Sequence, residues 1–237
     1  ICEKPIATSS REAAKVIQAA KKAKRRIFVA HCVRFWPTYA KAREMVKSKK
    51  YGKLLTAHFA RLSSTPLKSW KNWLQDPKKS GSAAMDLHIH DADFIVYLLG
   101  KPKSVTCRGG GFKKGRVDHI MTAYEYGAGQ LVTAEGAWEY ASSFGFSAYF
   151  RIALEKATIE LQPVTGKLML HPVDGASVEI DAAQSDAYVD ELAHFVECIS
   201  SKKKSKIATA ETALASVKLI EAELKSVETG KTVSVKL

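Results

Sequence analysis

The sequence lacks the long apolar run that a membrane-spanning helix requires. None of its 237 residues lies in a stretch approaching the roughly 20 apolar residues that cross a bilayer. No basic-then-apolar leader stands at its start. The first residue is Ile1 rather than an initiator Met, and a strand-like pattern begins at once. We therefore expect no membrane partner, and we expect this chain to be the remainder of something longer.

Closely spaced cysteines are also missing. The four cysteines, Cys2, Cys32, Cys107 and Cys198, form no C-x-x-C pair. This spacing matches neither a zinc pattern nor a disulfide framework. We expect reduced thiols, as in a cytoplasmic protein.

Acidic residues are few relative to basic ones, which leaves a formal net charge of +13. Much of the excess is lysine on expected helix faces, at 21–24 and 202–204. No aromatic residues alternate with these runs, and no helix-turn-helix or zinc-finger spacing is present. The pattern favours a solvated lysine-rich surface over nucleic-acid binding, and a preference for anionic ligands stays open.

The first 36 residues have the pattern of a strand, a helix and a second strand. Residues 1–4 look like a strand end, and Ser9 with Glu12 forms a capping box that opens a helix. An apolar strand follows at 25–33. Strand, helix, strand over this length predicts parallel strands joined by a right-handed crossover. One such unit cannot form a doubly wound domain alone, so residues 1–36 are predicted to be the C-terminal remnant of one.

Residues 37–237 are predicted to form a separate α+β domain. A helix at 38–52 and a strand at 53–64 precede a polar loop, and strands dominate from 105 to 180. Two of these strands face each other across "GAG", a hairpin signal. Two helices, at 185–200 and 209–227, and a short final strand close the chain. The prediction is an open, mostly antiparallel sheet with flanking helices.

Two groups of apolar residues have expected places in this domain. One sheet face is expected to be covered by aromatic residues, and a face so apolar could also serve as a subunit interface. The helix at 185–200 carries an apolar stripe at helical spacing. The aromatic group is Trp138, Tyr140, Phe146 and Tyr149, and the stripe is Val189, Leu192, Val196 and Ile199.

The stretch "AAMDLHIHDADF" at 83–94 places two histidines and three aspartates among apolar residues. On a strand, Asp86, His88 and His90 would share one face and resemble an H-x-H zinc site. On a helix, Asp86 and His90 stack one turn apart and His88 points elsewhere. The apolar pattern continues for 18 residues up to Gly100, too long for one strand, and no second metal-binding cluster follows. We therefore predict a helix and no metal.

A helical Asp-x-x-x-His pair has a definite chemical use. An imidazole with a pKa near about 6.5 accepts or donates a proton at neutral pH. A carboxylate one turn away orients it, raises its basicity or binds the same substrate hydroxyl. The structural alternative, a capped helix in which Asp86 and His90 simply hydrogen-bond, is equally compatible with this segment alone.

Three motifs in order extend the interpretation: "EKP" at the end of the first strand, "VRFWP" after the second, and "DLHIHDAD" some fifty residues later. Together they resemble the glucose-fructose oxidoreductase/inositol dehydrogenase (Gfo/Idh/MocA) family of NAD(P)-dependent oxidoreductases. The resemblance covers essentially the whole chain, with its motifs in the first 100 residues. It implies an N-terminal Rossmann domain that binds NAD or NADP. It also implies a C-terminal sheet domain that shapes a sugar or polyol pocket and commonly forms a dimer.

The resemblance also implies roles for particular residues. His90 would take the proton of a substrate hydroxyl as hydride leaves for the nicotinamide, and Lys4 would stabilise the developing alkoxide. Asp86 would hold His90 or a neighbouring hydroxyl in place. The implied set is catalytic Lys4, Asp86 and His90, cofactor-binding Glu3, Lys4 and Pro5, and substrate-binding Arg34, Trp36 and His88.

The chain departs from the family pattern in places. The glycine-rich run before Asp86 is reduced to "SGSAAMD", and His88 stands where relatives often have a small residue, so it would narrow the pocket or add a contact. No G-x-G-x-x-G is present, and "GGGF" at 109–112 does not qualify because no helix follows it. The phosphate-binding half of the cofactor site is therefore expected outside this sequence, which leaves NAD and NADP undistinguished.

Three functions stay open at this point. The first is the catalytic and substrate-binding part of a sugar or polyol dehydrogenase that is active only with its N-terminal part. The second is a non-catalytic dimerisation or ligand-binding module in which Lys4, Asp86 and His90 are relics. The third is a metal hydrolase, which would require stoichiometric zinc. Loss of the neighbouring Rossmann elements would expose strand edges and a helix face that these elements normally cover.

Overall fold

The computed structural model describes residues 1–111, 113–127 and 129–237. Phe112, the last residue of "GGGF", and Ala128, in the middle of the "GAG" turn, lie outside the described residues. The chain begins with a parallel strand pair in which Cys2 is opposite Val29. Ser9 caps the intervening helix by accepting a hydrogen bond from the Glu12 amide. These first elements are β1 (Cys2–Glu3), α1 (Ser10–Lys22), β2 (Val29–Ala30) and the short η1 (Cys32–Arg34).

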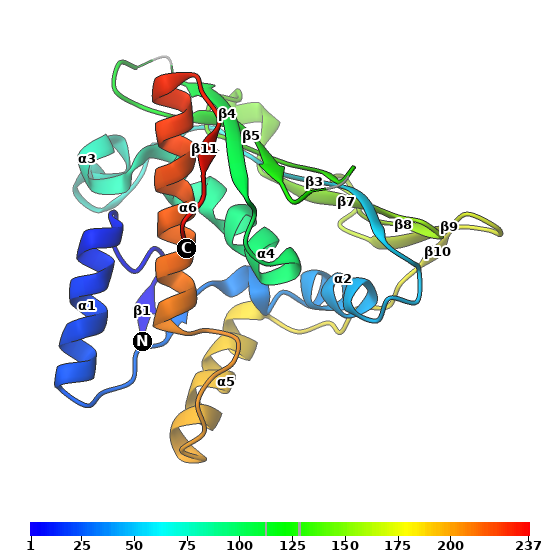
Figure 1. Ribbon diagram of the computed structural model, residues 1–237, viewed down its shortest axis with the longest axis horizontal. Helices are drawn as coiled ribbons and strands as arrows, with labels where there is room; N and C mark the ends of the chain where they lie inside the picture. Colours follow the sequence, from blue (N-terminus) through cyan, green and yellow to red (C-terminus); the bar gives the residue numbers. More distant parts are fainter. Residues whose placement is uncertain (112, 128) are drawn as a thin grey trace.

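The rest of the chain is built around a large sheet (Figure 1). Among the described residues, nine strands form it in the order β10-β9-β8-β7-β3-β6-β5-β4-β11. All neighbours are antiparallel except β3 and β6, which run parallel. The predicted α+β class with an open, mostly antiparallel sheet is confirmed. Its strands are β3 (Leu54–Leu62), β4 (Ser104–Gly110), β5 (His119–Glu125), β6 (Leu131–Ala137), β7 (Ser147–Leu154), β8 (Ala157–Leu161), β9 (Leu168–Pro172), β10 (Val178–Glu179) and β11 (Val233–Ser234).

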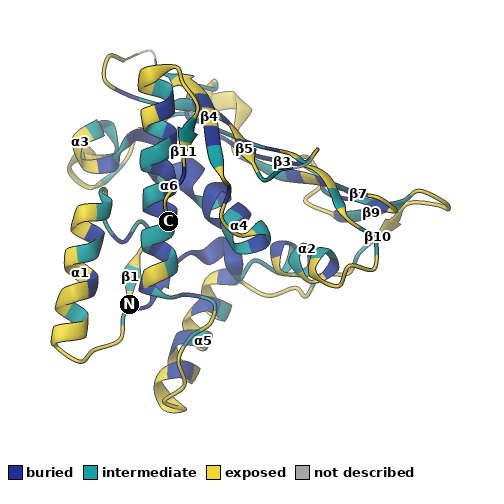
Figure 2. Cartoon of the chain, in the orientation of Figure 1, coloured by how far each residue is buried: buried dark blue, intermediate teal, exposed yellow. Residues whose placement is uncertain are grey.

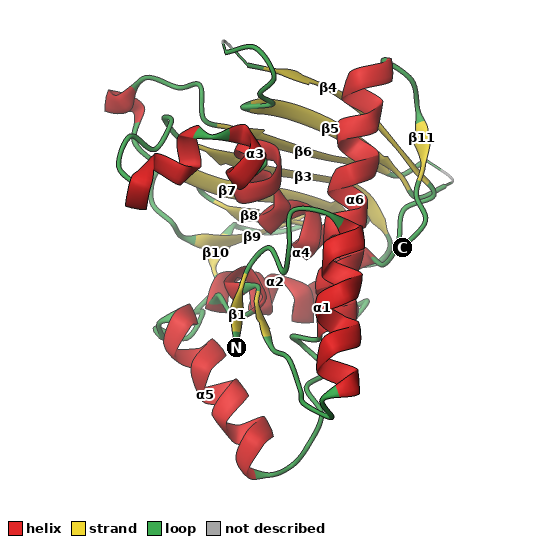
Figure 3. Cartoon of the chain, turned by 90° about the vertical axis from the view of Figure 1, so that its left-hand side faces the viewer, coloured by secondary structure: helices red, strands yellow, loops and turns green. Residues whose placement is uncertain are grey.

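Helices cover one face of this sheet and also connect it to the β1–β2 pair (Figure 3). The predicted helix at 82–99 is confirmed, but its first turn is a π-helix. The last long helix ends at Gly230, whose left-handed conformation suits glycine. The helical elements are α2 (Pro37–Lys47), η2 (Trp70–Gln75), α3 (Pro77–Ser80), η3 (Ala84–His88), α4 (Ile89–Leu99), η4 (Ser142–Phe144), α5 (Ala187–Ser200) and α6 (Ala210–Thr229).

Alternation along the strands separates the two faces of the sheet (Figure 2). In β5, Ile120, Thr122 and Tyr124 are buried, while Met121 and Glu125 are exposed. This period of two is what a strand with one packed face requires. The covered face therefore forms the core, and the other face is open in this chain.

An aromatic cluster fixes the helices to the covered face. Tyr39 of α2 meets Phe94 of α4 edge-to-face at 4.9 Å and Phe150 of β7 at 5.0 Å between ring centroids. Phe59 of β3 lies within 6 Å of both phenylalanine rings. Such contacts add about 0.5–1.5 kcal/mol each to the burial itself. They place α2 and the middle of α4 against the interior strands β3 and β7.

The aromatic residues predicted to cover a sheet face do not act as one group. Trp138 is buried against Leu87 in a small cluster, whereas Tyr140 and Tyr149 are half-buried in another. Phe146 is 58% exposed. The prediction of a single aromatic face is therefore wrong, because these residues occur at strand ends and loops as well as within strands.

Helix α5 buries the side opposite its apolar stripe. Its buried residues include Phe195, whose ring lies 5.0 Å from that of Phe28 beside β2. The apolar stripe faces outward, with Leu192 50% exposed and Val196 58% exposed. An exposed apolar stripe of this length is unusual for a helix whose partners are all present. The full stripe is Tyr188, Val189, Leu192, Val196 and Ile199.

One hydrophobic core runs through both halves of the chain. Ala13 and Ile17 of α1 and Val29 of β2 share a cluster with Val217 and Ile220 of α6. The division of the chain at residue 36 stays a prediction, because packing across it is continuous. Within the described residues, no helix is both long and apolar enough to cross a membrane.

Candidate functional site

The end of β1 meets the π-helical turn η3 through Lys4 and Asp86. The Lys4 ammonium donates to the Asp86 backbone carbonyl at 2.6 Å and to its carboxylate at 3.0 Å. Both side chains are mostly buried but keep some exposure, 14% for Lys4 and 20% for Asp86. The structure therefore brings together two of the predicted catalytic residues, which are 82 positions apart.

His90 lies one turn further along, at the start of α4. Its side chain is partly buried, and its Nδ1 atom is shielded from solvent without a hydrogen-bond partner. Burial, followed by the positive charges of Lys4 and Arg61, lowers the pKa of His90 well below its usual value. His90 is therefore neutral at pH 7 and is able to accept a proton.

Asp86 is paired with Lys4 rather than with His90. The hydrogen bonds of Asp86 at η3 both come from the Lys4 ammonium. A carboxylate in this position fixes the direction of the ammonium. In this structure Asp86 holds Lys4, and the expected role of Asp86 in holding His90 or a neighbouring hydroxyl stays a prediction.

His31 is a further imidazole at this edge, which the sequence analysis did not single out. It follows β2 directly, is 2% exposed, and has no hydrogen bond on either ring nitrogen. Its Nδ1 atom is 3.5 Å from an Asp93 carboxylate oxygen. Burial lowers the pKa of His31 to about 4, so the ring is neutral. Its signal in the sequence was a histidine directly after an apolar strand.

Arg61 was also not predicted as a site residue from the sequence. It is the second-last residue of β3 and forms a buried bidentate pair with Asp91, at 2.8 and 3.0 Å. The guanidinium also donates to the Tyr39 hydroxyl at 3.1 Å. An arginine inside an otherwise apolar strand was the available signal, because charged residues are seldom fully buried unless paired. Arg61 brings a fixed positive charge close to His90.

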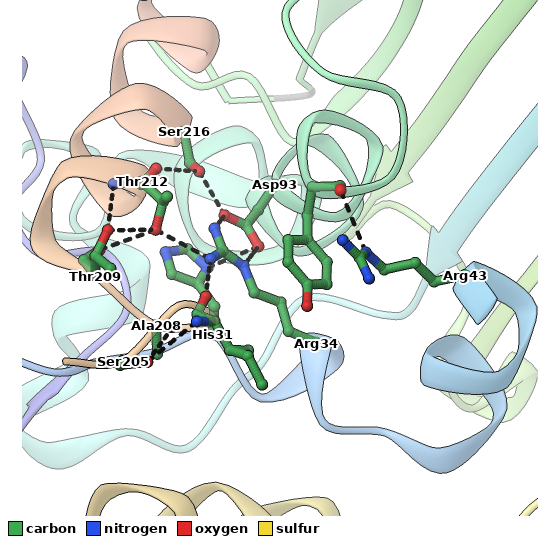
Figure 4. Close-up of polar contacts among 11 residues, drawn as sticks. His31, Arg34, Arg43, Asp93, Ser205, Ala208, Thr209, Thr212 and Ser216 are labelled. Carbon is green, nitrogen blue, oxygen red and sulfur yellow. Dashed lines mark hydrogen bonds and ion pairs between the residues drawn. The ribbon is translucent and has the colours of Figure 1, made fainter. Parts of the chain in front are cut away.

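Arg34, a predicted substrate contact, is instead fully engaged inside the protein (Figure 4). Its guanidinium pairs with Asp93 of α4 at 2.5 and 2.8 Å, and both side chains are about 2% exposed or less. It also donates to the Ile207 carbonyl and to the Thr212 hydroxyl. Ser216 of α6 donates to the same carboxylate. Arg34 therefore connects η1, α4 and the start of α6, and has no donor directed at the Lys4–Asp86 contact.

His88, also predicted to contact substrate, is buried behind η3. Its side chain has no exposure, and its Nε2 atom is 3.0 Å from a Glu223 carboxylate oxygen of α6. As the helical spacing predicts, it points away from the Asp86 side. The structure places it within the core rather than in the pocket.

The remaining predicted residues lie around the site. Glu3 is exposed at the end of β1, where its carboxylate accepts from the Lys4 amide, and Pro5 is half-buried next to it. Trp36 is half-buried and lines a cavity of about 580 Å³. Phe146 shares that cavity and lies 5.9 Å from the Arg61 guanidinium.

Glu191 of α5 is a buried acid on the side of this region formed by η1. It is 3% exposed, and its Oε1 atom has no hydrogen-bond partner. Burial, with a smaller contribution from Glu3, raises the pKa of Glu191 from 4.5 to about 7. The folded state thus binds a proton here that the unfolded state releases.

This shift predicts a pH-dependent loss of stability that Glu191→Gln removes. Because the folded pKa is the higher one, wild-type stability falls as pH rises from about 4.5 to about 7. The variant should match the wild type at the acid end and be more stable by about 3 kcal/mol above pH 7. Urea unfolding across this range measures it. Glu197→Gln, an exposed acid on the same helix, should show no such gain, and equal pH profiles for wild type and Glu191→Gln would refute the prediction.

Across the described residues, no group of three or more His, Cys, Asp or Glu side chains has the geometry to hold a metal ion. All four cysteines are free thiols.

The sequence and the fold resemble those of known proteins. Residues 39–160 match the profile of the GFO/IDH/MocA C-terminal domain. A 2,7-anhydro-N-acetylneuraminate hydratase of Escherichia coli (strain K12) is 26% identical over 71% of this chain, an alignment that spans 47% of the hydratase. Inositol 2-dehydrogenase 2 of Saccharopolyspora erythraea is 28% identical over 100% of this chain and 69% of its own length.

A solved structure shares the fold at lower identity. Levoglucosan dehydrogenase, in complex with NADH and levoglucosan, superposes with a TM-score of 0.85 at 18% identity. The superposition covers 100% of this chain and 73% of the dehydrogenase. The chain thus spans about seven tenths of this relative, and less than half of the hydratase is aligned.

Proposed function

Because the chain belongs to the GFO/IDH/MocA family, we propose that it is the substrate-binding and catalytic part of an NAD(P)-dependent oxidoreductase. The reaction is hydride transfer between a sugar or polyol hydroxyl and a nicotinamide. The observation that carries this proposal is the contact of Lys4 with Asp86, one helical turn from a neutral His90. The three side chains have the properties that oxidation of an alcohol requires: a base, a cationic donor and a carboxylate that orients the donor.

The proposed roles of the three residues follow from these contacts. His90 accepts the proton of the substrate hydroxyl through a ring nitrogen and returns it in the reverse direction. Lys4 donates a hydrogen bond to the substrate oxygen as negative charge develops on it. Asp86 keeps the Lys4 ammonium directed at that oxygen. Neighbouring Arg61 disfavours the charged form of His90 and so preserves the base.

The residues present fit the nicotinamide end of the cofactor. Lys4 and His31 lie where β1 and β2 end, and ligands of parallel α/β sheets bind at that edge. His31 offers buried ring nitrogens without partners, as expected where a ligand amide binds. Glu3, Lys4 and Pro5 would hold this end of the cofactor. When bound, the nicotinamide supplies the hydride-transfer chemistry.

The phosphate end of the cofactor needs a further dinucleotide-binding unit, because these 237 residues contain no G-x-G-x-x-G. Two features support a docking surface for such a unit. Strand β1 pairs only with β2 among the described strands, which leaves its other edge free. Helix α5, which packs beside β2, presents the apolar stripe that includes Leu192 and Val196 to solvent.

Cofactor titration tests the proposal first. We expect NADH or NADPH to bind this chain weakly, with a Kd above the micromolar range, because only the nicotinamide end is contacted. Supplying the dinucleotide-binding unit should bring binding into the micromolar range. Fluorescence or calorimetric titration measures both. Absence of binding with that unit present would refute the oxidoreductase and leave a non-catalytic dimerisation or ligand-binding module.

Substrate screening follows cofactor binding. The relatives are named for a sialic-acid derivative and an inositol, which supports a polyhydroxylated substrate. One of them is named a hydratase, so each candidate sugar should be followed both by nicotinamide absorbance and by product mass. If the product mass rises by one water and the nicotinamide absorbance shows no net change, the activity is that of a hydratase and not of a dehydrogenase.

We also propose a homo-oligomer formed through the open sheet face, in the cytoplasm. The free thiols support the location. The open face includes Met121 and Leu131, both more than half exposed. Light scattering should give a mass of a multiple of 26.0 kDa. Met121→Lys should shift that mass towards the single chain, whereas a wild type that is already monomeric would exclude the interface.

A further inference from the structure

The candidate site rests on a π-helical turn rather than on a regular helix. Residues Ala84–His88 form the π-turn η3, and regular α-helix begins at Ile89. A π-turn holds one residue more than an α-turn, and such turns are frequent at functional sites. Closing it to an α-turn would rotate the preceding residues by about 100° about the helix axis. Asp86 lies within the turn, so its direction depends on the turn being kept open.

His88 anchors the back of this turn in the core. Its side chain is fully buried, whereas Asp86 on the other side of the turn contacts Lys4. A Cβ added at Gly136 of β6 would lie 2.6 Å from the His88 Cβ and 2.9 Å from its Nδ1. The glycine therefore provides the space that the imidazole occupies.

Glu223 meets this imidazole from the opposite side. Its carboxylate lies 3.0 Å from His88 Nε2, and neither side chain is exposed. The Tyr124 hydroxyl of β5 is 3.4 Å from the same nitrogen. The contacts come from α6, β5 and β6, so His88 is held from three directions.

A buried carboxylate beside an imidazole contributes little net stability to a core. Apolar side chains of similar volume are often as stable or more stable, because burying a carboxylate carries a desolvation penalty. Buried polar pairs do, however, specify one geometry over near alternatives. The near alternative here is the closed α-helical register of residues 84–88.

We propose that Glu223 is a positioning residue of the candidate site: through His88 it keeps the turn η3 open and so keeps Asp86 directed at Lys4. The Glu223 carboxylate holds the His88 imidazole in place. The imidazole occupies the space beside Gly136 and so holds the turn η3 in its π-helical form. This proposal rests on the proposed function. The direction of Asp86 matters because Asp86 sets the direction of the Lys4 ammonium, which that function requires.

Hydrogen exchange and lysine labelling of Glu223→Leu test this without any substrate. Amide exchange in residues 84–90 should accelerate by about tenfold or more, because the buried carboxylate that faces His88 is lost. Acetylation of Lys4 should accelerate by a similar factor relative to Lys15, an exposed residue of α1. Both are read by mass spectrometry. Glu223→Gln keeps the size and an acceptor for His88, so it should restore the slow rates.

Glu221→Leu is the matched control, since it removes another acid of α6 that binds elsewhere, at the Ser10 amide. It should leave residues 84–90 and the Lys4 to Lys15 ratio unchanged. If Glu223→Leu does not fold, Gly136→Ala displaces His88 without removing any polar group and should produce the same two changes. Unchanged exchange at 84–90 in a folded Glu223→Leu or Gly136→Ala protein would overturn the proposal. So would equal acceleration in Glu221→Leu. A failure of NAD(P)H binding would affect only the proposed function.

Discussion

Asp93→Asn is expected to lower the free energy of unfolding by about 3–5 kcal/mol, because it leaves the Arg34 guanidinium buried without its counter-charge. The Arg34 and Asp93 side chains are 2% and 1% exposed, so water cannot replace the lost partner. The same carboxylate accepts from Ser216 and lies 3.5 Å from His31. The substitution therefore weakens the connection of η1 with both α4 and α6. Urea denaturation at constant pH measures the loss.

Two controls separate this effect from a general effect of charge removal. Glu211→Gln breaks the exposed pair with Lys21, whose side chains are 62% and 67% exposed, and should cost less than about 1 kcal/mol. Replacing both buried partners, as Arg34→Met with Asp93→Leu, should cost less than Asp93→Asn alone. An Asp93→Asn protein within about 1 kcal/mol of the wild type would show that the pair is not structurally important.

His90→Asn and Lys4→Met are expected to reduce kcat by about 10²–10⁴-fold in the hydride-transfer assay, because they remove the base and the donor to the substrate oxygen. The assay is run under conditions in which NADH or NADPH has been shown to bind. Both variants should keep substrate affinity within a few-fold, since the proposed contacts to the substrate oxygen act mainly in the transition state. Steady-state kinetics of the purified variants gives kcat and KM separately.

The pH profile gives an independent check on His90. Its pKa is lowered, so the base is neutral below the usual imidazole value of about 6.5. Alcohol oxidation should therefore persist below pH 6.5 and fall only at more acidic pH, where the ring becomes protonated. Lys15→Met, a change on the exposed face of α1, should leave both kcat and the profile unaltered. Full activity in His90→Asn would assign the base to another residue.

Much of the local structure was predictable from neighbouring residues. The helix after residue 82 follows from an apolar pattern too long for a strand, and it places Asp86 and His90 on one side. The helix α1 follows from its capping residues and apolar spacing. These predictions succeed because periodicity and capping are properties of consecutive residues.

Helix α5 shows where the same reasoning stops. The stripe that includes Leu192 and Val196 has good helical spacing, yet it faces solvent, while Phe195 and Cys198 are buried. Both sides of this helix carry apolar residues. Spacing alone identifies a helix but does not choose between two apolar sides, because that choice depends on which elements pack beside it.

The sequence by itself determined the elements of this protein, its family resemblance and three residues of its candidate site. Only the tertiary structure decided that Arg34 pairs with Asp93 and that His88 pairs with Glu223, both inside the protein. It also brought His31 and Arg61 close to His90. The physical reason is distance along the chain. Helices form from contacts a few residues apart. The pairing of strands and of buried charges depends on residues far away in the chain, such as the 59 positions between Arg34 and Asp93, and only the complete fold brings them together.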